Sequence, residues 1–221
     1  MIEDFVVLIP LRGGSKGLSK KNLRLFNGKP LFTWCTNAAL NANLKVIIST
    51  ECQDIKDSVQ KFCPKAIIQD RPLSLATDTS STEDVIKFFI QEYNYNNIIL
   101  LQATSPLTLT SDIKLAIEYY KKCLYRPLVS GIRKHIFAWG DEGYSLNYDP
   151  MNRPRRQDWK GCFVENGAIY IFQRNDFELF NSRCPEPCTL FEMTKYTSVE
   201  IDSEEDLIYL ESLNKRFNIL P

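Results

Sequence analysis

The sequence predicts an α/β fold in which a mostly parallel sheet lies between helical layers. Three observations lead to this prediction: short apolar runs alternate with amphipathic segments, the alternation has the spacing of strand–helix units, and loops rich in small and polar residues follow two of the runs. A run that is apolar at consecutive positions is typical of a strand covered on both faces. In such folds, ligands bind beyond the carboxyl ends of the strands.

Each expected element has a local cause. The strands are the apolar runs, which cover residues 6–10, 45–49, 66–68, 97–102 and 167–172. The helices lie between or after them, over residues 30–42, 54–62, 82–93, 111–123 and 204–216. Helix 30–42 has a proline near its start, and helix 82–93 begins with Thr82-Glu83-Asp84, which resembles a capped start. Between residues 133 and 160 the alternation stops, so we expect an excursion from the core there, in the form of a β-arm.

Composition limits the possible partners. The 221 residues suit a single domain, and 27 basic side chains balance 27 acidic ones. This neutral balance does not favour nucleic acid or membrane as a partner. The acidic start Met1-Ile2-Glu3-Asp4 does not resemble a secretory signal, and no apolar run is long enough for a membrane span. Seven scattered cysteines do not form a secreted disulfide framework, so we expect a cytoplasmic protein.

The opening loop (residues 9–22) reads Ile-Pro-Leu-Arg-Gly-Gly-Ser-Lys-Gly-Leu-Ser-Lys-Lys-Asn. It has neither the Walker A spacing nor the three-glycine dinucleotide spacing. Its glycines nevertheless let backbone N–H groups approach an anion, and Arg12, Lys16 and Lys21 add charged donors. The loop therefore predicts a phosphate site, with a solvated basic turn as the alternative.

Two further stretches carry charged side chains in a suggestive pattern. Residues 197–202 alternate so that Glu200 and Asp202 would share one face of a strand, where two carboxylates can hold Mg²⁺. Alternatively, Asp202 caps the helix that starts near Ser203. The basic cluster Arg153 to Gln157 would bind a carboxylate, although a solvated turn or a nucleic-acid patch has the same composition. The single histidine, His135, is interpreted as structural or as a surface residue.

Six stretches in this order resemble the cytidylyltransferases that activate acidic keto-sugars, and most closely their N-acylneuraminate (sialic acid) branch. The opening loop is similar to that family's signature, with Leu11 in place of the common alanine. The other five stretches are Arg71-Pro72 with Leu75-Ala-Thr-Asp78, Leu101-Gln-Ala-Thr-Ser-Pro-Leu107, Arg153-Pro-Arg-Arg-Gln-Asp-Trp159, Glu165-Asn-Gly-Ala-Ile-Tyr170 and Ser198-Val-Glu-Ile-Asp202. The resemblance spans residues 5 to about 210 and implies a Rossmann-like nucleotide-diphospho-sugar transferase fold.

The resemblance also implies a reaction, in which CTP and a nine-carbon 2-keto acid sugar give the CMP-sugar and pyrophosphate. The residues implied for CTP are Arg12, Ser15, Lys16, Lys21, Asn22, Arg71, Ser80 and Thr82. Those implied for the sugar are Gln102, Thr104, Ser105, Arg156, Gln157 and Asn166. Glu200 and Asp202 would hold Mg²⁺, Lys21 would stabilise the reacting phosphates, and Asp202 would act as the base through a water. Residues 133–162 would form a dimerisation and substrate arm in a homodimer.

Two departures from the family pattern stand out, and several substrates remain open. Glu200 replaces the usual aspartate, and Ala138 stands where the animal-type pattern has a basic residue. The acidic sugar would be a sialic acid, with legionaminic, pseudaminic and eight-carbon keto-deoxy acids as alternatives. A CTP-binding module without turnover is the alternative outside catalysis.

Overall fold

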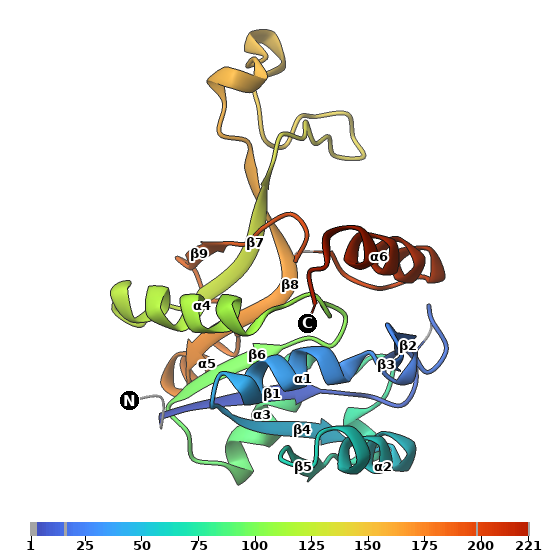
Figure 1. Ribbon diagram of the computed structural model, residues 1–221. Coiled ribbons are helices and arrows are strands. Elements are labelled where there is room, and N and C mark those ends of the chain that lie inside the picture. Colours follow the sequence, from blue (N-terminus) through green and yellow to red (C-terminus); the bar gives the residue numbers. More distant parts are fainter. Residues whose placement is uncertain (1–3, 16, 198, 221) are drawn as a thin grey trace.

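The chain forms one large sheet with helices on both faces. The computed structural model describes residues 4–15, 17–197 and 199–220 (Figure 1). In these ranges the sheet has seven strands, in the order β5-β4-β1-β6-β8-β7-β9. The strands are β1 (Phe5–Pro10), β4 (Lys45–Thr50), β5 (Ile67–Asp70), β6 (Asn97–Leu101), β7 (Leu128–Lys134), β8 (Cys162–Gln173) and β9 (Thr189–Glu192). A separate antiparallel hairpin joins β2 (Leu25–Phe26) to β3 (Lys29–Pro30).

The sheet is mostly parallel, as predicted. Strand β1 pairs in parallel with both β4 and β6, β4 with β5, and β7 with β9. Of the seven strands described in this sheet, only β8 runs antiparallel to its neighbours, which are β6 and β7. All five expected strands are present, and β8 is longer than predicted because it continues from the core into the arm. Strands β7 and β9 were not predicted.

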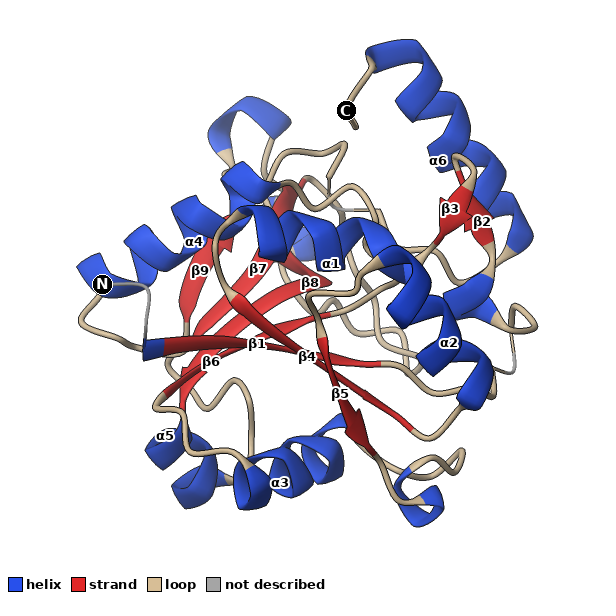
Figure 2. Ribbon diagram, turned by 60° about the horizontal axis from the view of Figure 1, so that its bottom comes forward, coloured by secondary structure: helices blue, strands red, loops and turns tan. Residues whose placement is uncertain are grey.

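Two helical layers cover the sheet (Figure 2). One face carries α1 (Phe32–Asn41), α2 (Gln53–Phe62) and α4 (Thr110–Lys122), and the other carries α3 (Thr82–Glu92) and α5 (Arg174–Phe180). Both interfaces are packed with fully buried aliphatic and aromatic side chains, which hold the strand ends in fixed positions. The N-cap of α3 is Ser81, one residue before the expected start, because its hydroxyl and Asp84 form a capping box.

The final helix α6 (Glu204–Phe217) lies away from the sheet. Its inner face packs on the β2–β3 hairpin and on the opening loop in a third apolar cluster, which includes Phe26, Leu207 and Leu210. The described helices include none that is long and apolar enough to span a bilayer. All seven cysteines are free.

The predicted strand over residues 197–202 is wrong. Residues 195–197 form a turn, Ser198 lies outside the described residues, and residues 199–202 form no strand. Residues 199–202 are tied to the loop after β6 by a backbone hydrogen bond, 2.7 Å long, from Ile201 N–H to Thr104 C=O. The fully buried Ile201 side chain joins the apolar cluster under α6, so packing, not strand pairing, fixes the segment.

The excursion expected after residue 133 is an arm that projects from the body (Figure 1). Its stem is the antiparallel ladder in which Arg133 faces Phe163 and Lys134 faces Cys162. Its tip contains two 3₁₀ turns, η4 (Pro150–Asn152) and η5 (Arg156–Asp158). Aromatic contacts organise the tip: the rings of Phe137 and Trp159 stack at 5.1 Å, and the Arg153 guanidinium lies 3.9 Å from the Phe137 ring centre.

Candidate active site

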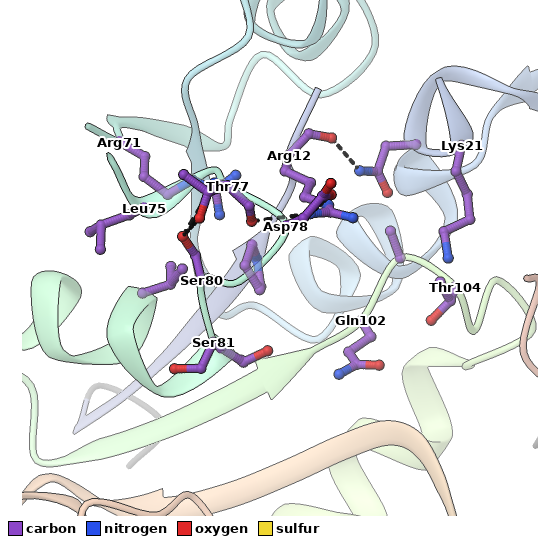
Figure 3. Close-up of a pocket in the computed structure, with 15 residues that line it drawn as sticks. Arg12, Lys21, Arg71, Leu75, Thr77, Asp78, Ser80, Ser81, Gln102 and Thr104 are labelled. Carbon is purple, nitrogen blue, oxygen red and sulfur yellow. Dashed lines mark hydrogen bonds and ion pairs between the residues drawn. The ribbon is translucent and has the colours of Figure 1, made fainter. Parts of the chain in front are cut away.

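A cavity of about 330 Å³ opens beyond the carboxyl ends of β1, β5 and β6 (Figure 3). The opening loop supplies one part of its wall and the loop after β6 another, so the two loops face one crevice. Of the expected residues, this first cavity is lined by Arg12, Lys21, Asn22, Arg71, Ser80, Thr82, Gln102 and Thr104. The cavity is therefore lined mainly by polar and cationic side chains, which suits an anionic ligand.

Hydrogen bonds between distant segments hold the opening loop at the first cavity. Asn22 Nδ2 donates to the Arg12 carbonyl at 3.0 Å, which ties the two ends of the loop together. The Arg12 guanidinium reaches the Thr77 carbonyl at 3.2 Å and the Asp78 carboxylate at 3.1 Å (Figure 3). The Ser80 hydroxyl donates to the Ser74 carbonyl at 3.1 Å. The opening loop and the 74–80 segment thus form one connected wall.

Arg71, one of the residues implied for CTP, is bound to other parts of the protein. Its guanidinium donates to Glu51 at 2.6 Å and to the Leu11 carbonyl at 3.0 Å, and its side chain is only 3% exposed. The other Glu51 oxygen accepts the Gly13 N–H at 2.6 Å. Burial alone raises the pKa of Glu51, but the hydrogen bonds from Arg71 and Gly13 outweigh it and lower the pKa below its usual range. Arg71 therefore also braces the opening loop.

Sequence reasoning missed Glu51. A positional signal was present, because Glu51 directly follows β4, whose carboxyl end lies at the same edge of the sheet. The residue has no motif of its own, and its partner Arg71 lies 20 positions further along the chain.

Lys21 and Asp202 meet although 181 positions separate them. The ammonium and carboxylate groups lie 2.9 Å apart, with Lys21 mostly buried and the Asp202 side chain 70% exposed. Asp202 does not cap α6, so that alternative is wrong. Ser203 is the N-cap, and its capping box uses Asp206, which also accepts the Asp202 N–H at 3.1 Å. The Asp202 carboxylate is left facing the opening loop.

A second cavity, of about 570 Å³, lies at the base of the arm. Of the expected residues, it is lined by Arg156, Asn166 and Glu200. Asn166 is buried and accepts a hydrogen bond of 2.6 Å from the Ser130 hydroxyl, which fixes its side chain. Burial, followed by the nearby charge of Asp202, raises the pKa of Glu200 despite the opposing charge of Lys21.

Gly167 lies where the two cavities approach each other. Its φ of +63° belongs to the left-handed region, and a Cβ there would come within 2.4 Å of Glu200 Oε1 and 3.0 Å of Gln102 Oε1. Gln102 lines the first cavity and Glu200 the second. The missing side chain at residue 167 therefore lets groups from both cavities come together.

Five expected residues lie outside these two cavities or outside the described residues, and one of them is Asp202, which meets Lys21 but lines neither cavity. Ser105 is fully buried, and its hydroxyl has no hydrogen-bond partner in the described part of the chain. Ser15 and Gln157 line neither cavity, and Lys16 lies outside the described residues.

Glu200 and Asp202 suit a hard metal ion only in part. Both side chains offer oxygen, the donor that Mg²⁺ prefers. Across the described ranges, no cluster of three or more histidine, cysteine or acidic side chains is arranged to hold a metal by itself. The pair therefore fits a cation that takes its remaining ligands from water and from substrate phosphates, which is the usual way that Mg²⁺ is bound.

Known proteins resemble this chain in both sequence and fold. An N-acylneuraminate cytidylyltransferase of Oncorhynchus mykiss is 34% identical over 220 residues, covering 95% of this chain and 50% of the relative. One from Streptococcus agalactiae serotype V is 29% identical over 219 residues, with 93% and 52% covered. The chain spans about half the length of the curated relatives it matches.

Two solved structures have the same fold. CMP:2-keto-3-deoxy-manno-octonic acid synthetase, complexed with CTP, superposes with a TM-score of 0.72 at 20% identity, covering 96% of this chain and 98% of that one. The 4-diphosphocytidyl-2C-methyl-D-erythritol synthase of Anaerococcus prevotii gives 0.67 at 12% identity, covering 97% and 98%. A family model described as cytidylyltransferase matches residues 6–216. The chain therefore belongs to the cytidylyltransferase family.

Proposed function

We propose that this chain transfers CMP from CTP to a nine-carbon acidic 2-keto sugar of the N-acylneuraminate type and releases pyrophosphate. The observation that carries the proposal is the meeting of two different cavities at Gly167. One is lined by the opening loop, which suits a triphosphate, and the other holds cations and amides that suit an acidic sugar. The N-acylneuraminate cytidylyltransferases that match the chain support the choice of sugar.

In this proposal CTP occupies the first cavity. The triphosphate lies against Arg12, Ser15, Lys16 and Lys21, with Asn22 close to the nucleotide. The cytosine lies toward Ser80 and Thr82, in the wall that Arg71 braces. Backbone N–H groups of the opening loop come close to the phosphates because its glycines have no side chains in the way.

The acidic sugar occupies the second cavity. Arg156 would bind its carboxylate, because a planar guanidinium offers two parallel donors to one carboxylate. Asn166, held by the Ser130 hydroxyl, would contact the sugar hydroxyls. Gln102 and Thr104 would contact the sugar from the adjoining first cavity. Ser105 is fully buried and Gln157 lines neither cavity, so neither is assigned a sugar contact. Gln102 lies next to Gly167, so it would contact the sugar at its reacting end.

In this reaction the protein positions the two substrates and stabilises the negative charge of the phosphates, and it forms no covalent intermediate. The anomeric hydroxyl attacks the α-phosphorus in line while the bond to pyrophosphate breaks. Lys21 stabilises the negative charge on the phosphates, and Asp202 both orients Lys21 and takes the hydroxyl proton through an intervening water. Mg²⁺ held by Glu200 and Asp202 would supply further positive charge beside the triphosphate when bound.

We also propose that the protein is cytoplasmic and forms a homodimer. Free cysteines suit the reducing cytoplasm. A projecting arm with exposed apolar side chains, such as Ile136 and Met151, suits a homodimer in which residues 133–162 contact the second copy. Sedimentation of the purified chain tests this point, and a monomer at every concentration would contradict it.

A pyrophosphate-release assay tests the reaction. The chain is supplied with CTP and Mg²⁺ and, in parallel, with N-acetylneuraminate, an eight-carbon keto-deoxy acid, and legionaminic- and pseudaminic-type sugars. We expect fastest release with N-acetylneuraminate, and none when UTP or ATP replaces CTP. Saturable CTP binding with no pyrophosphate release in the presence of any of these sugars would instead identify a CTP-binding module without turnover.

A further inference from the structure

The second cavity contains more positive charge than the expected residues account for. Of the side chains that line it, five are basic or carry an imidazole and two are carboxylates. They are Arg133, Lys134, His135, Arg156 and Lys195, with Glu165 and Glu200. Such an excess of donors around a polar cavity favours an anionic group in the ligand.

Most of these groups already have partners within the protein. Arg133 Nε lies 3.6 Å from the Glu192 carboxylate, and its guanidinium lies over the Phe163 ring. His135 Nε2 and the Trp159 carbonyl are 2.8 Å apart. Lys195 also interacts within the protein. By contrast, neither Lys134 nor Arg156 makes a side-chain hydrogen bond or ion pair with the described residues.

The fold brings Lys134 and Arg156 to one cavity from two segments. Lys134 is the last residue of β7, where the antiparallel pairing with Cys162 fixes its place on the arm stem. Arg156 begins η5, on the return path from the tip toward β8. A point charge on a rigid strand and a planar guanidinium from a turn together offer the donor set that a carboxylate needs.

Ala138 and Gln157 do not supply this charge. Ala138 belongs to the arm tip, where its N–H donates to Asn147 Oδ1 at 3.0 Å, and it does not line the cavity. Gln157 is neutral and lies outside the cavity as well. Lys134 and Arg156 are thus the two basic side chains lining this cavity that have no side-chain hydrogen bond or ion pair with the described residues.

We propose that Lys134 binds the carboxylate of the acidic sugar together with Arg156 and makes the enzyme select acids over neutral sugars. This inference rests on the proposed function. Lys134 is exposed at the edge of the cavity, so water screens part of its charge. Its removal is expected to raise the KM for the acid roughly tenfold and to leave the KM for CTP unchanged.

The test compares Lys134→Met and Lys134→Arg with a matched control, Lys114→Met. Lys114 is also an exposed lysine, but it lies on α4, outside the arm, and lines neither cavity. Each protein is assayed for pyrophosphate release with CTP and either N-acetylneuraminate or its methyl ester, which lacks the carboxylate charge. Thermal melting of all four proteins identifies any variant that is misfolded.

We expect K134M to raise the KM for the acid but not for the ester, K134R to restore most of the acid preference, and K114M to match the wild type. Equal KM values for the acid in K134M and K114M would overturn the inference and leave the proposed function intact. An acid-to-ester preference unchanged in K134M would overturn it too. Failure of the wild type itself to release pyrophosphate with any sugar would overturn both.

Discussion

Replacing Glu51 by glutamine tests whether the buried pair with Arg71 supports the opening loop. The substitution keeps the size of the side chain and removes its charge. Arg71 is 3% exposed and Glu51 10%, so a guanidinium would remain in the interior without its counter-charge. Removing one partner of a buried pair typically costs 3–5 kcal/mol, and because Glu51 retains some exposure we expect a loss of about 3 kcal/mol.

The assay is urea unfolding at neutral pH, with Asp54→Asn as the matched control. That second change also converts a carboxylate to an amide, but it breaks the exposed pair with Lys20, in which the side chains are 60% and 67% exposed. The control should unfold at the same urea concentration as the wild type because water screens exposed pairs. The E51Q variant should unfold at a distinctly lower urea concentration. Coincident unfolding curves for E51Q and the wild type would refute the reasoning.

The pH dependence gives a second check on the same pair. The pKa of Glu51 is lowered in the folded chain, so its contribution to stability is present above its unfolded pKa of about 4.3 and is lost as the pH falls through the folded pKa. The gap in unfolding free energy between wild type and E51Q should therefore narrow as the pH is lowered below about 4. A gap that stays constant down to pH 3 would show that the Glu51 charge is not its source.

Three further outcomes are expected. Asp202→Asn should leave the melting temperature unchanged, because the side chain is 70% exposed, yet reduce pyrophosphate release at least a hundredfold; release near the wild-type rate would remove both proposed roles of Asp202. Gly167→Ala should destabilise the chain by about 2 kcal/mol through its φ of +63° and displace Glu200 and Gln102, lowering kcat; an active variant of wild-type stability would contradict the packing. Chelation with EDTA should stop turnover and leave CTP binding measurable by calorimetry, and added Mg²⁺ should restore turnover. Turnover that persists in EDTA would exclude the metal role of Glu200 and Asp202.

The parts of the fold that were predictable are those with a purely local cause. Continuous apolar runs identified β1, β4, β6 and β8, because a strand covered on both faces is apolar at consecutive positions. The edge strand β5 was identified only from its short apolar run at residues 66–68. Strand β9 was missed because it is a short edge strand with an exposed leucine and an exposed glutamate, so it lacks that signal. Strand β7 was missed because it ends in Arg133 and Lys134, two charged residues that are more typical of a loop than of a strand in an arm stem.

The residues of the candidate site divide in the same way, into those with a local sequence signal and those that only the fold brings together. The opening loop was recognisable because its glycines and cations are adjacent in the sequence. The pairs Glu51–Arg71 and Lys21–Asp202 were not, because each forms only when separate strand ends and loops converge. The strand predicted over 197–202 failed for a related reason: alternation there reflects burial of Ile201 under α6, and no neighbouring strand is available to pair with it.

Strand β8 separates two kinds of change that this chain can undergo. Its final residues, Ile169–Gln173, pair with β6 in the core, whereas Cys162–Glu165 pair with β7 in the arm stem. Substitutions in the stem can therefore reshape the second cavity without disturbing the parallel strand ends that line the first. Under the proposed function, a chain built in this way would exchange one sugar for another during evolution and keep the same donor.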